Sequence, residues 1–339
     1  MTTTIRPTTP HGGAPDTPRT LSLRLGRSDK IFTRGTFASG MIVLSIMGAV
    51  GFFLTLESTD ALGKVGFGFL TTSVWEPDRG VFGIRAVVTF TILIALVAVA
   101  IALPISIATA LFIAEIAPRR LRSLLVSLVD LMAAVPSVVY GLWGAFLMQG
   151  QVIGVSRWIN TWFSWIPLFK VEGADPSNPL SNATVYSAST FVAGVVVAMM
   201  VIPIQCVVMR EVFSQVPPGE REGAFALGST RWGMIRVVTI PFGRGGIIGG
   251  TMLGLGRALG ETIAVYMVIS SRFDVSFNVL EAGSNSVSAL IALRYGEASE
   301  FGLSALFAAG LSLFMITLVV NFVASWFVSR SRSGASSDA

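Results

Sequence analysis

Residues 86–116 read AVVTFTILIALVAVAIALPISIATALFIAEI and contain no charged side chain before Glu115. A helix of about 20 consecutive apolar residues crosses the ~30 Å hydrocarbon core of a bilayer. The whole chain shares this bias, because 53% of its 339 residues are hydrophobic, 13% are charged and its mean hydropathy is +0.73. A soluble domain usually carries about 25% charged residues. The chain is therefore predicted to be an integral membrane protein.

The apolar runs predict an all-α protein with six transmembrane helices. Each run is continuously apolar, whereas membrane-spanning strands would alternate between apolar and polar residues. Pro104 and Pro136 interrupt the second and third runs, and neighbours in a helical bundle can satisfy the carbonyls that a proline frees. The predicted spans are 36–56, 86–116, 122–149, 189–209, 246–270 and 303–328.

The composition along the chain predicts four segments. Residues 1–30 are rich in Thr, Pro and Arg and are expected to form a disordered basic tail. Residues 31–60 contain a first transmembrane anchor, which is too long for a signal-peptide core and lacks a clear cleavage site. Residues 61–330 form the core with five further helices, and residues 331–339 form a flexible C-terminus.

The basic residues predict the orientation of the chain in the membrane. Of the 24 Lys and Arg residues, sixteen fall on the side that carries both predicted termini, seven on the other side, and Arg257 within a span. The positive-inside rule places the richer side in the cytoplasm. The net charge of +5 then reflects topology and contact with anionic lipid, so binding to nucleic acid is not needed to explain it.

The sequence lacks the residues of a catalytic or metal site. His11 is the single histidine and lies in the tail, and Cys206 is the single cysteine and lies in an apolar run. Histidine-based metal sites and triads are therefore excluded. The chain has no G-x-x-x-x-G-K-[ST] loop, so any ATP hydrolysis belongs to another polypeptide. We expect a protein that is not an enzyme and holds neither a metal nor a cofactor of its own.

Between the fourth and fifth predicted spans, residues 217–232 read PPGEREGAFALGSTRW. Proline at the start and acidic residues in the first turn favour helix initiation. Gly228 can end this helix in a left-handed conformation, and Ser229 or Thr230 can cap the next helix. We predict two short helices that meet at Gly228 outside the bilayer, before the chain re-enters the membrane past Pro241.

This loop resembles the E-A-A-x-x-x-G-x9-I-x-L-P motif of importer permeases of the ATP-binding-cassette (ABC) class. Residues 222–224 align with E-A-A, with Gly223 in place of the usual alanine, and residues 238–241 align with I-x-L-P. The alternative is an ordinary helical loop between two spans. The resemblance implies that the loop is a coupling helix seated in a groove of an ATPase subunit. The coupling residues implied are Glu222, Gly223, Ala224, Gly228, Arg231 and Pro241.

Three further segments resemble the phosphate-specific importer permeases: FGIR at 82–85, VPSVVYGLWG at 135–144 and GLGRALGET at 254–262. The last of these resembles the PstC type of permease more than the PstA type. The resemblance covers residues 65–328. It implies a type I ABC importer permease fold, with residues 61–330 as the permease core, 217–241 as its coupling loop, and a location in the bacterial plasma membrane.

The same resemblance implies the partners. They are a second, PstA-like permease, two PstB-like ATPase subunits that bind ATP and Mg, and a PstS-like extracellular phosphate-binding protein. The chain would then be the transport subunit that forms the translocation path together with the second permease.

Two charged residues, Arg257 and Glu261, lie within the fifth predicted span. A charge there costs at least ~2.5–3.5 kcal/mol, so it needs a partner or a polar path. Their i,i+4 spacing predicts that they pair on one helix face. Glycines every four residues at 246–254 predict close approach of a helix, as suits a path-lining helix that faces a second subunit.

We predict that Arg257 binds phosphate through its planar guanidinium. Glu261 would either hold Arg257 when the path is empty or accept a hydrogen bond from the P–OH of hydrogen phosphate. A purely structural ion pair is the alternative. Arg85 could receive the anion or extend to the membrane interface. Ser137 and Tyr140 could donate hydroxyls to substrate or pack against a neighbouring helix.

The predicted function is that of a permease subunit of an ATP-driven inorganic phosphate importer. One alternative is a permease for another oxyanion, such as sulfate or molybdate. A second is a proton-coupled secondary anion transporter, although such transporters commonly contain internal repeats and none is visible here. A third, an intramembrane enzyme, lacks the catalytic residues it would need.

Overall fold

The computed structural model describes residues 26–171, 173 and 185–331, so the expectations for the tail up to residue 25 and for the C-terminus from 332 lie outside the described residues. The chain divides into two compact units, Met1–Val50 and Gly51–Ala339. In the first unit the described residues belong almost entirely to α1 (Arg27–Glu57). Its segment Ser28–Glu57 is long and apolar enough to span a membrane.

Helix α1 begins earlier than predicted. Residues 27–30, which the sequence assigned to the basic tail, are the first residues of this helix. The physical reason is a local cap, because the Asp29 carboxylate accepts the Gly26 N–H at 3.1 Å. An acid in the first turn also interacts favourably with the positive end of the helix dipole.

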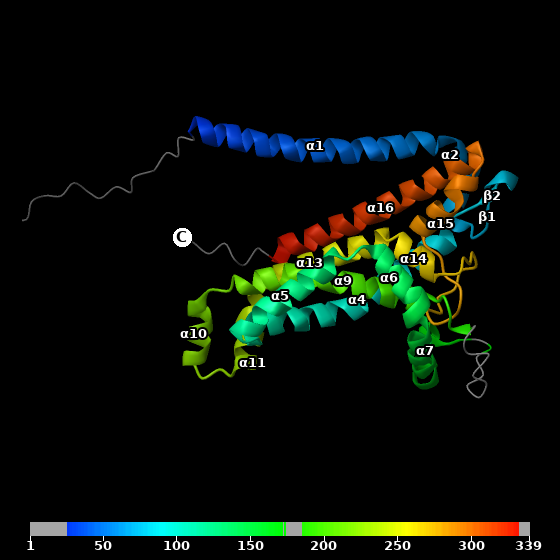
Figure 1. The fold of residues 1–339 in the computed structure, drawn as a ribbon. Helices are drawn as coiled ribbons and strands as arrows, with labels where there is room; N and C mark the ends of the chain where they lie inside the picture. The colour runs from blue at the N-terminus through cyan, green and yellow to red at the C-terminus, as the bar shows by residue number, and fades with distance from the viewer. Residues whose placement is uncertain (1–25, 172, 174–184, 332–339) are drawn as a thin grey trace, which may run out of the picture. The chain divides into compact units, whose positions relative to one another are not determined.

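Long helices dominate the second unit, as Figure 1 shows. They are α4 (Arg85–Leu111), α9 (Thr190–Ser214), α13 (Arg244–Gly260) and α16 (Glu300–Ser331). Helix α9 packs against both α4 and α13, and α13 also packs against α16. The all-α membrane fold is therefore confirmed.

Glycines allow α9 to approach both of its neighbours closely. Gly194 lies where a Cβ would meet the Val97 side chain of α4 at 2.5 Å. The row Gly246, Gly250 and Gly254 of α13 is buried against α9 in the same way. The close helix approach predicted for these three glycines is confirmed, and the helix that approaches is α9 of the same chain.

The third predicted span, 122–149, is wrong as an unbroken helix. Helix α5 (Arg119–Ala134) ends at Val135 and Pro136, which are both extended. Proline disfavours helical geometry at the residue before it and lacks an N–H of its own, so the chain breaks here and does not merely kink. Helix α6 (Ser137–Trp143) and α7 (Gln149–Phe163) follow, joined by a π-helical turn. The segment long enough to span the membrane is 137–163.

The fifth predicted span, 246–270, is also interrupted. Helix α13 stops at Gly260 and the chain resumes as α14 (Ile263–Val268). Within the described residues, five uninterrupted helices are therefore long and apolar enough to cross a membrane, where six were predicted. These five are Ser28–Glu57, Arg85–Ile116, Ser137–Phe163, Thr190–Ser214 and Glu300–Val323.

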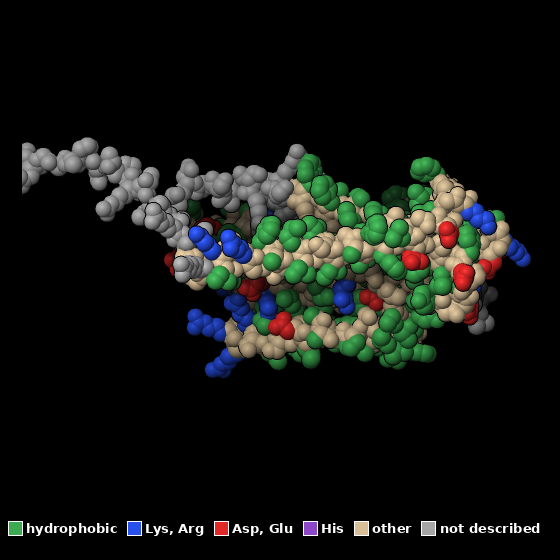
Figure 2. All heavy atoms as spheres, turned by 90° about the horizontal axis from the view of Figure 1, so that it is seen from above, with side chains coloured by type: hydrophobic (Ala, Val, Ile, Leu, Met, Phe, Trp, Pro, Cys, Tyr) green, Lys and Arg blue, Asp and Glu red, His purple; other side chains and the backbone are tan. Residues whose placement is uncertain are grey.

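Short elements lie at the two ends of the second unit (Figure 1). At one end are α10 (Pro218–Ala226), α11 (Arg231–Met234) and α12 (Ile240–Phe242). At the other end are α2 (Thr59–Val65), α3 (Gly68–Thr71), α15 (Val287–Arg294) and the antiparallel strands β1 (Trp75–Glu76) and β2 (Val81–Phe82). Figure 2 shows hydrophobic side chains along the middle of one face and most charged side chains toward its ends, as expected for a protein that crosses a bilayer.

Candidate functional site: coupling loop and membrane arginine

The coupling loop consists of two short helices that meet at Gly228. Helix α10 ends in a Schellman motif: the Gly228 N–H donates to the Phe225 carbonyl at 2.9 Å, and the Ser229 N–H to the Ala224 carbonyl at 3.1 Å. Gly228 has φ +83°, the left-handed conformation that this motif requires. The Thr230 hydroxyl accepts the Gly233 N–H at 3.1 Å and caps α11. The two short helices predicted to meet at Gly228, with a left-handed glycine and a Thr230 cap, are therefore confirmed.

The loop presents one face to the protein and one outward. Ala224 is buried among residues at the ends of α4, α5 and α9. Glu222, Gly223 and Arg231 are exposed. Large apolar side chains are exposed as well, among them Leu227 at 90% and Trp232 at 64%. Large apolar residues exposed together are typical of a surface that binds another protein or a membrane.

One acidic residue that the sequence did not single out holds this loop in place. Glu115 lies in the π-helical turn Phe112–Ile116 that extends α4, and its side chain is only 5% exposed. Its carboxylate pairs with Arg221 of α10 at 2.9 Å and accepts the Thr239 hydroxyl at 3.2 Å. The only sequence signal is its position, as the first charge after a long apolar run.

The predicted pair between Arg257 and Glu261 is wrong. The ion pairs between described residues do not include it. The helix ends at Gly260, and Glu261 is extended (ψ 126°), so the i,i+4 geometry is lost. The Glu261 side chain accepts the N–H of Ala264 at 3.2 Å in the first turn of α14. The residue is 8% exposed, so the carboxylate acts as a buried cap for that helix.

Arg257 lies in the last turn of α13 and is exposed in the isolated chain. It lines an open cavity of about 740 Å³ together with residues of α9, α13 and α16. The other lining residues are Ile204, Gly249, Met252, Leu253, Gly256 and Asn321. Among the described residues Arg257 forms no ion pair, and a cation in a groove lined mainly by apolar residues can bind an anion.

Tyr140 was expected either to donate its hydroxyl to substrate or to pack against a neighbouring helix, and in the structure this hydroxyl is bonded within the chain. Its O–H donates to the Met132 carbonyl at 3.0 Å across the break at Pro136. The same carbonyl also accepts the Val135 N–H at 3.3 Å, so the Tyr140 hydroxyl is a second donor to it where α5 ends. Ser137 is the first residue of α6 and half-buried, and no hydrogen bond of its hydroxyl occurs within the part of the chain that the structure describes.

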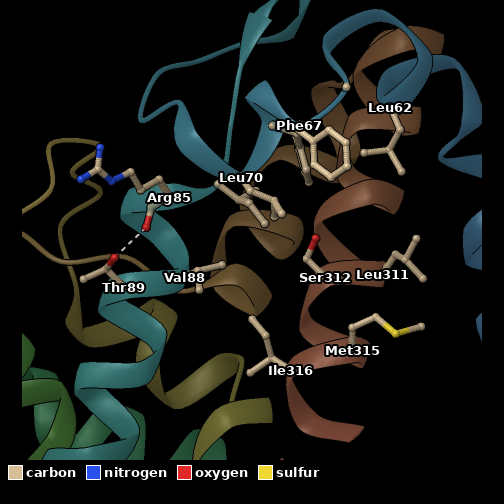
Figure 3. Close-up of a pocket in the computed structure, with 13 residues that line it drawn as sticks. Leu62, Phe67, Leu70, Arg85, Val88, Thr89, Leu311, Ser312, Met315 and Ile316 are labelled. Carbon is tan, nitrogen blue, oxygen red and sulfur yellow. Dashed lines mark hydrogen bonds between the residues drawn. The ribbon is translucent and has the colours of Figure 1, made fainter. Parts of the chain in front are cut away.

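Arg85 is the first residue of α4 and is exposed. It lies beside a cavity of about 740 Å³ bounded by α2, α3, α4 and α16. Figure 3 shows its guanidinium pointing away from that cavity, whose walls include Leu311 and Ser312. Arg85 and Arg257 line different cavities, so the structure does not bring them together.

Comparison with known proteins identifies the family. Residues 102–333 match the family described as binding-protein-dependent transport system inner membrane component. The phosphate transport system permease protein PstC of Mesorhizobium japonicum is 35% identical over 92% of this chain and 94% of its own length. The protein of the same name from Xylella fastidiosa is 36% identical over 93% of this chain and 94% of its own length.

Two solved structures share the fold at low sequence identity. A chain of a bacterial ABC transporter for the import of the acidic polysaccharide alginate has a TM-score of 0.54 and 18% identity, over 90% of this chain and 99% of its own. A chain of the inward-facing methionine ABC transporter MetNI has a TM-score of 0.51 and 12% identity, over 73% and 95%. The fold is that of a type I ABC importer permease. The chain belongs to the family of binding-protein-dependent transport system inner membrane components.

Proposed function

We propose that this chain is the PstC-like permease subunit of an ATP-driven importer of inorganic phosphate. The observation that carries the proposal is the 35–36% identity to PstC permeases over nearly the whole chain. In this proposal the chain forms the path with a PstA-like permease and receives phosphate from a PstS-like binding protein. Two PstB-like subunits bind and hydrolyse ATP.

The exposed face of the coupling loop supports the assignment of ATP hydrolysis to a partner. Leu227 and Trp232 would enter an apolar groove of the ATPase, and Glu222 and Arg231 would flank them. Gly228 sets the bend between α10 and α11, and Pro241 lies within the helical segment α12 that follows them. In this proposal the exposed face lies outside the bilayer. The C-terminal end of α16 lies at the same end of the unit as α10 (Figure 1), which supports a cytoplasmic C-terminus.

Arg257 is the residue we assign to phosphate in the path. A guanidinium offers two parallel N–H donors that match two phosphate oxygens. Its exposure on the isolated chain is what a path shared with a second permease requires, because the other wall comes from the partner. Glu261 positions the helix break beside Arg257, and we assign Arg85, Ser137 and Tyr140 to the lining with no direct contact to phosphate.

The test is uptake by the purified complex in proteoliposomes, with labelled phosphate, sulfate and molybdate supplied with their binding proteins. We expect phosphate uptake that requires both ATP and the phosphate-binding protein. Preferential uptake of sulfate or molybdate would assign the chain to another oxyanion. Uptake by the isolated chain under a proton gradient, without ATPase subunits, would make it a secondary transporter and overturn the proposal.

A further inference from the structure

Glu115 connects the end of a membrane-spanning helix to both sides of the coupling loop. Its carboxylate contacts Arg221 of α10, on the entry side of the loop, and Thr239, on the exit side. The Arg221 guanidinium also donates to the Phe213 carbonyl near the end of α9 at 2.9 Å. A single buried carboxylate and its arginine therefore join α4, α9, α10 and the return segment.

The ion pair between Arg221 and Glu115 is short and largely shielded from solvent. The Arg221–Glu115 distance of 2.9 Å is that of a charge-assisted hydrogen bond, which is about twice as strong as a neutral one. Burial of the Glu115 carboxylate keeps solvent from screening the pair. Arg221 Nε is buried without a hydrogen-bond partner, so this arginine depends on Glu115 and Phe213 for its polar contacts.

The two segments joined at Glu115 share an irregular geometry. Glu115 lies in the π-helical turn Phe112–Ile116, and Thr239 ends a second π-helical turn, Ile235–Thr239. A π-helical turn departs from the regular helical hydrogen-bond ladder and is frequent at functional sites. A π-helical turn therefore lies on each side of the coupling loop, and the hydrogen bond from Thr239 to the Glu115 carboxylate joins the two turns.

We propose that Glu115 is a positioning residue that transmits displacement of α10 to α4 and to the segment leading into α13. This inference rests on the proposed function, in which a partner ATPase moves α10. Without the carboxylate, α10 would keep its polar link to α9 through the Phe213 carbonyl but lose the link through Glu115 to α4 and Thr239, and ATP would be hydrolysed with less transport. An anchor that only stabilises the fold would instead lower ATP hydrolysis and transport in proportion.

The experiment compares Glu115→Gln with the wild type in the full complex with its partner subunits. Glutamine keeps the shape and an acceptor oxygen for Thr239 but removes the charge that holds Arg221. The readouts are ATPase activity stimulated by phosphate-loaded binding protein, phosphate imported per ATP, and recovery of ATPase subunits with the permease. Glu211→Gln is the matched control, since Glu211 is an exposed acid at the end of α9.

We expect Glu115→Gln to lower phosphate imported per ATP at least fivefold, with stimulated ATPase within twofold of wild type. Glu115→Asp, which keeps the charge, should recover part of the loss, and Glu211→Gln should match wild type. An unchanged ratio, or a proportional fall in both activities, would overturn the inference. If Glu115→Gln fails to assemble, Thr239→Val removes one contact and leaves the ion pair, and an unchanged ratio there would overturn it equally.

Failure of the proposed function is distinguishable. If the wild-type complex imports sulfate and not phosphate, the phosphate assignment fails and the ratio is measured with sulfate. If the wild-type complex imports no anion in response to ATP, the proposed function and the inference on Glu115 are both wrong.

Discussion

The Ser288 hydroxyl donates a hydrogen bond of 2.7 Å to the backbone carbonyl of Glu261. This contact connects the first turn of α15 to the break between α13 and α14. Both residues are 8% exposed, so the bond forms away from solvent. The Glu261 carbonyl is no longer part of the hydrogen-bond pattern of α13, and Ser288, 27 residues further along the chain, supplies its donor. This bond fixes the position of the break between α13 and α14.

Ser288→Ala is expected to destabilise the protein by about 1–2 kcal/mol, because it leaves a buried carbonyl without its donor. Thermal unfolding of the purified complex measures this effect. Ser312→Ala is the matched control, since the Ser312 hydroxyl donates to Ala308 within its own helix. Equal unfolding temperatures for the two variants would contradict a role for Ser288 in holding the break.

Arg257→Ala is expected to lower the rate of phosphate uptake at least tenfold, since a charge-assisted hydrogen bond contributes about 1.5–3 kcal/mol. Arg257→Lys should lower it less but still clearly, because lysine keeps the charge and loses the two-pronged geometry. Initial rates in proteoliposomes measure both. Arg244→Lys, at the start of the same helix, is the control. Normal uptake by Arg257→Ala would remove this residue from the path.

Gly254→Ala is expected to destabilise the chain by about 1–3 kcal/mol through overpacking. A Cβ there would collide with the Gln205 amide and meet Val201 at 2.7 Å. Gly245→Ala, in the same helix, has no neighbour within 4 Å and should have no such cost. The denaturation midpoints of Gly254→Ala and Gly245→Ala measure this difference in stability. Similar midpoints would mean that α9 and α13 are not closely packed at Gly254.

Two alanine substitutions in the coupling loop are expected to act in opposite directions. Gly223→Ala should stabilise α10 by about 0.5–1 kcal/mol, because the site is helical, exposed and without neighbours within 4 Å. Gly228→Ala should destabilise the loop by about 1–2 kcal/mol, since its positive φ is unfavourable for alanine. Hydrogen exchange of the α10 amides measures both changes. Faster exchange in Gly223→Ala would refute the first.

The sequence was sufficient to predict those parts of the structure that depend on residues close to one another in the chain. Gly228 and Thr230 were predicted at the junction of the two loop helices because their conformations follow from residues within five positions. The apolar runs predicted membrane crossing for the same reason, since length and composition decide it.

The errors arose where a distant contact decides the outcome. The i,i+4 rule for Arg257 and Glu261 assumed an unbroken helix, whereas Glu261 leaves it to cap α14 and is held by Ser288. Glu115 finds its partners 106 and 124 residues away, which no spacing rule reaches. Pro136 was recognised as an interruption, but the hydrogen bond from Tyr140 to Met132 across it joins residues eight positions apart, a spacing that no helical rule covers.

The break after Gly260 also explains how a guanidinium can remain within apolar surroundings without a counter-ion. The last four carbonyls of α13 have no donors further along the helix, so this end of the helix carries a partial negative charge. Arg257 lies within that last turn. The helix end carries about half a negative elementary charge, which stabilises the Arg257 cation without neutralising it. An arriving anion would therefore compete only with the helix dipole and would not have to displace a carboxylate. In the role proposed for Arg257, phosphate binding would therefore be reversible at each turnover.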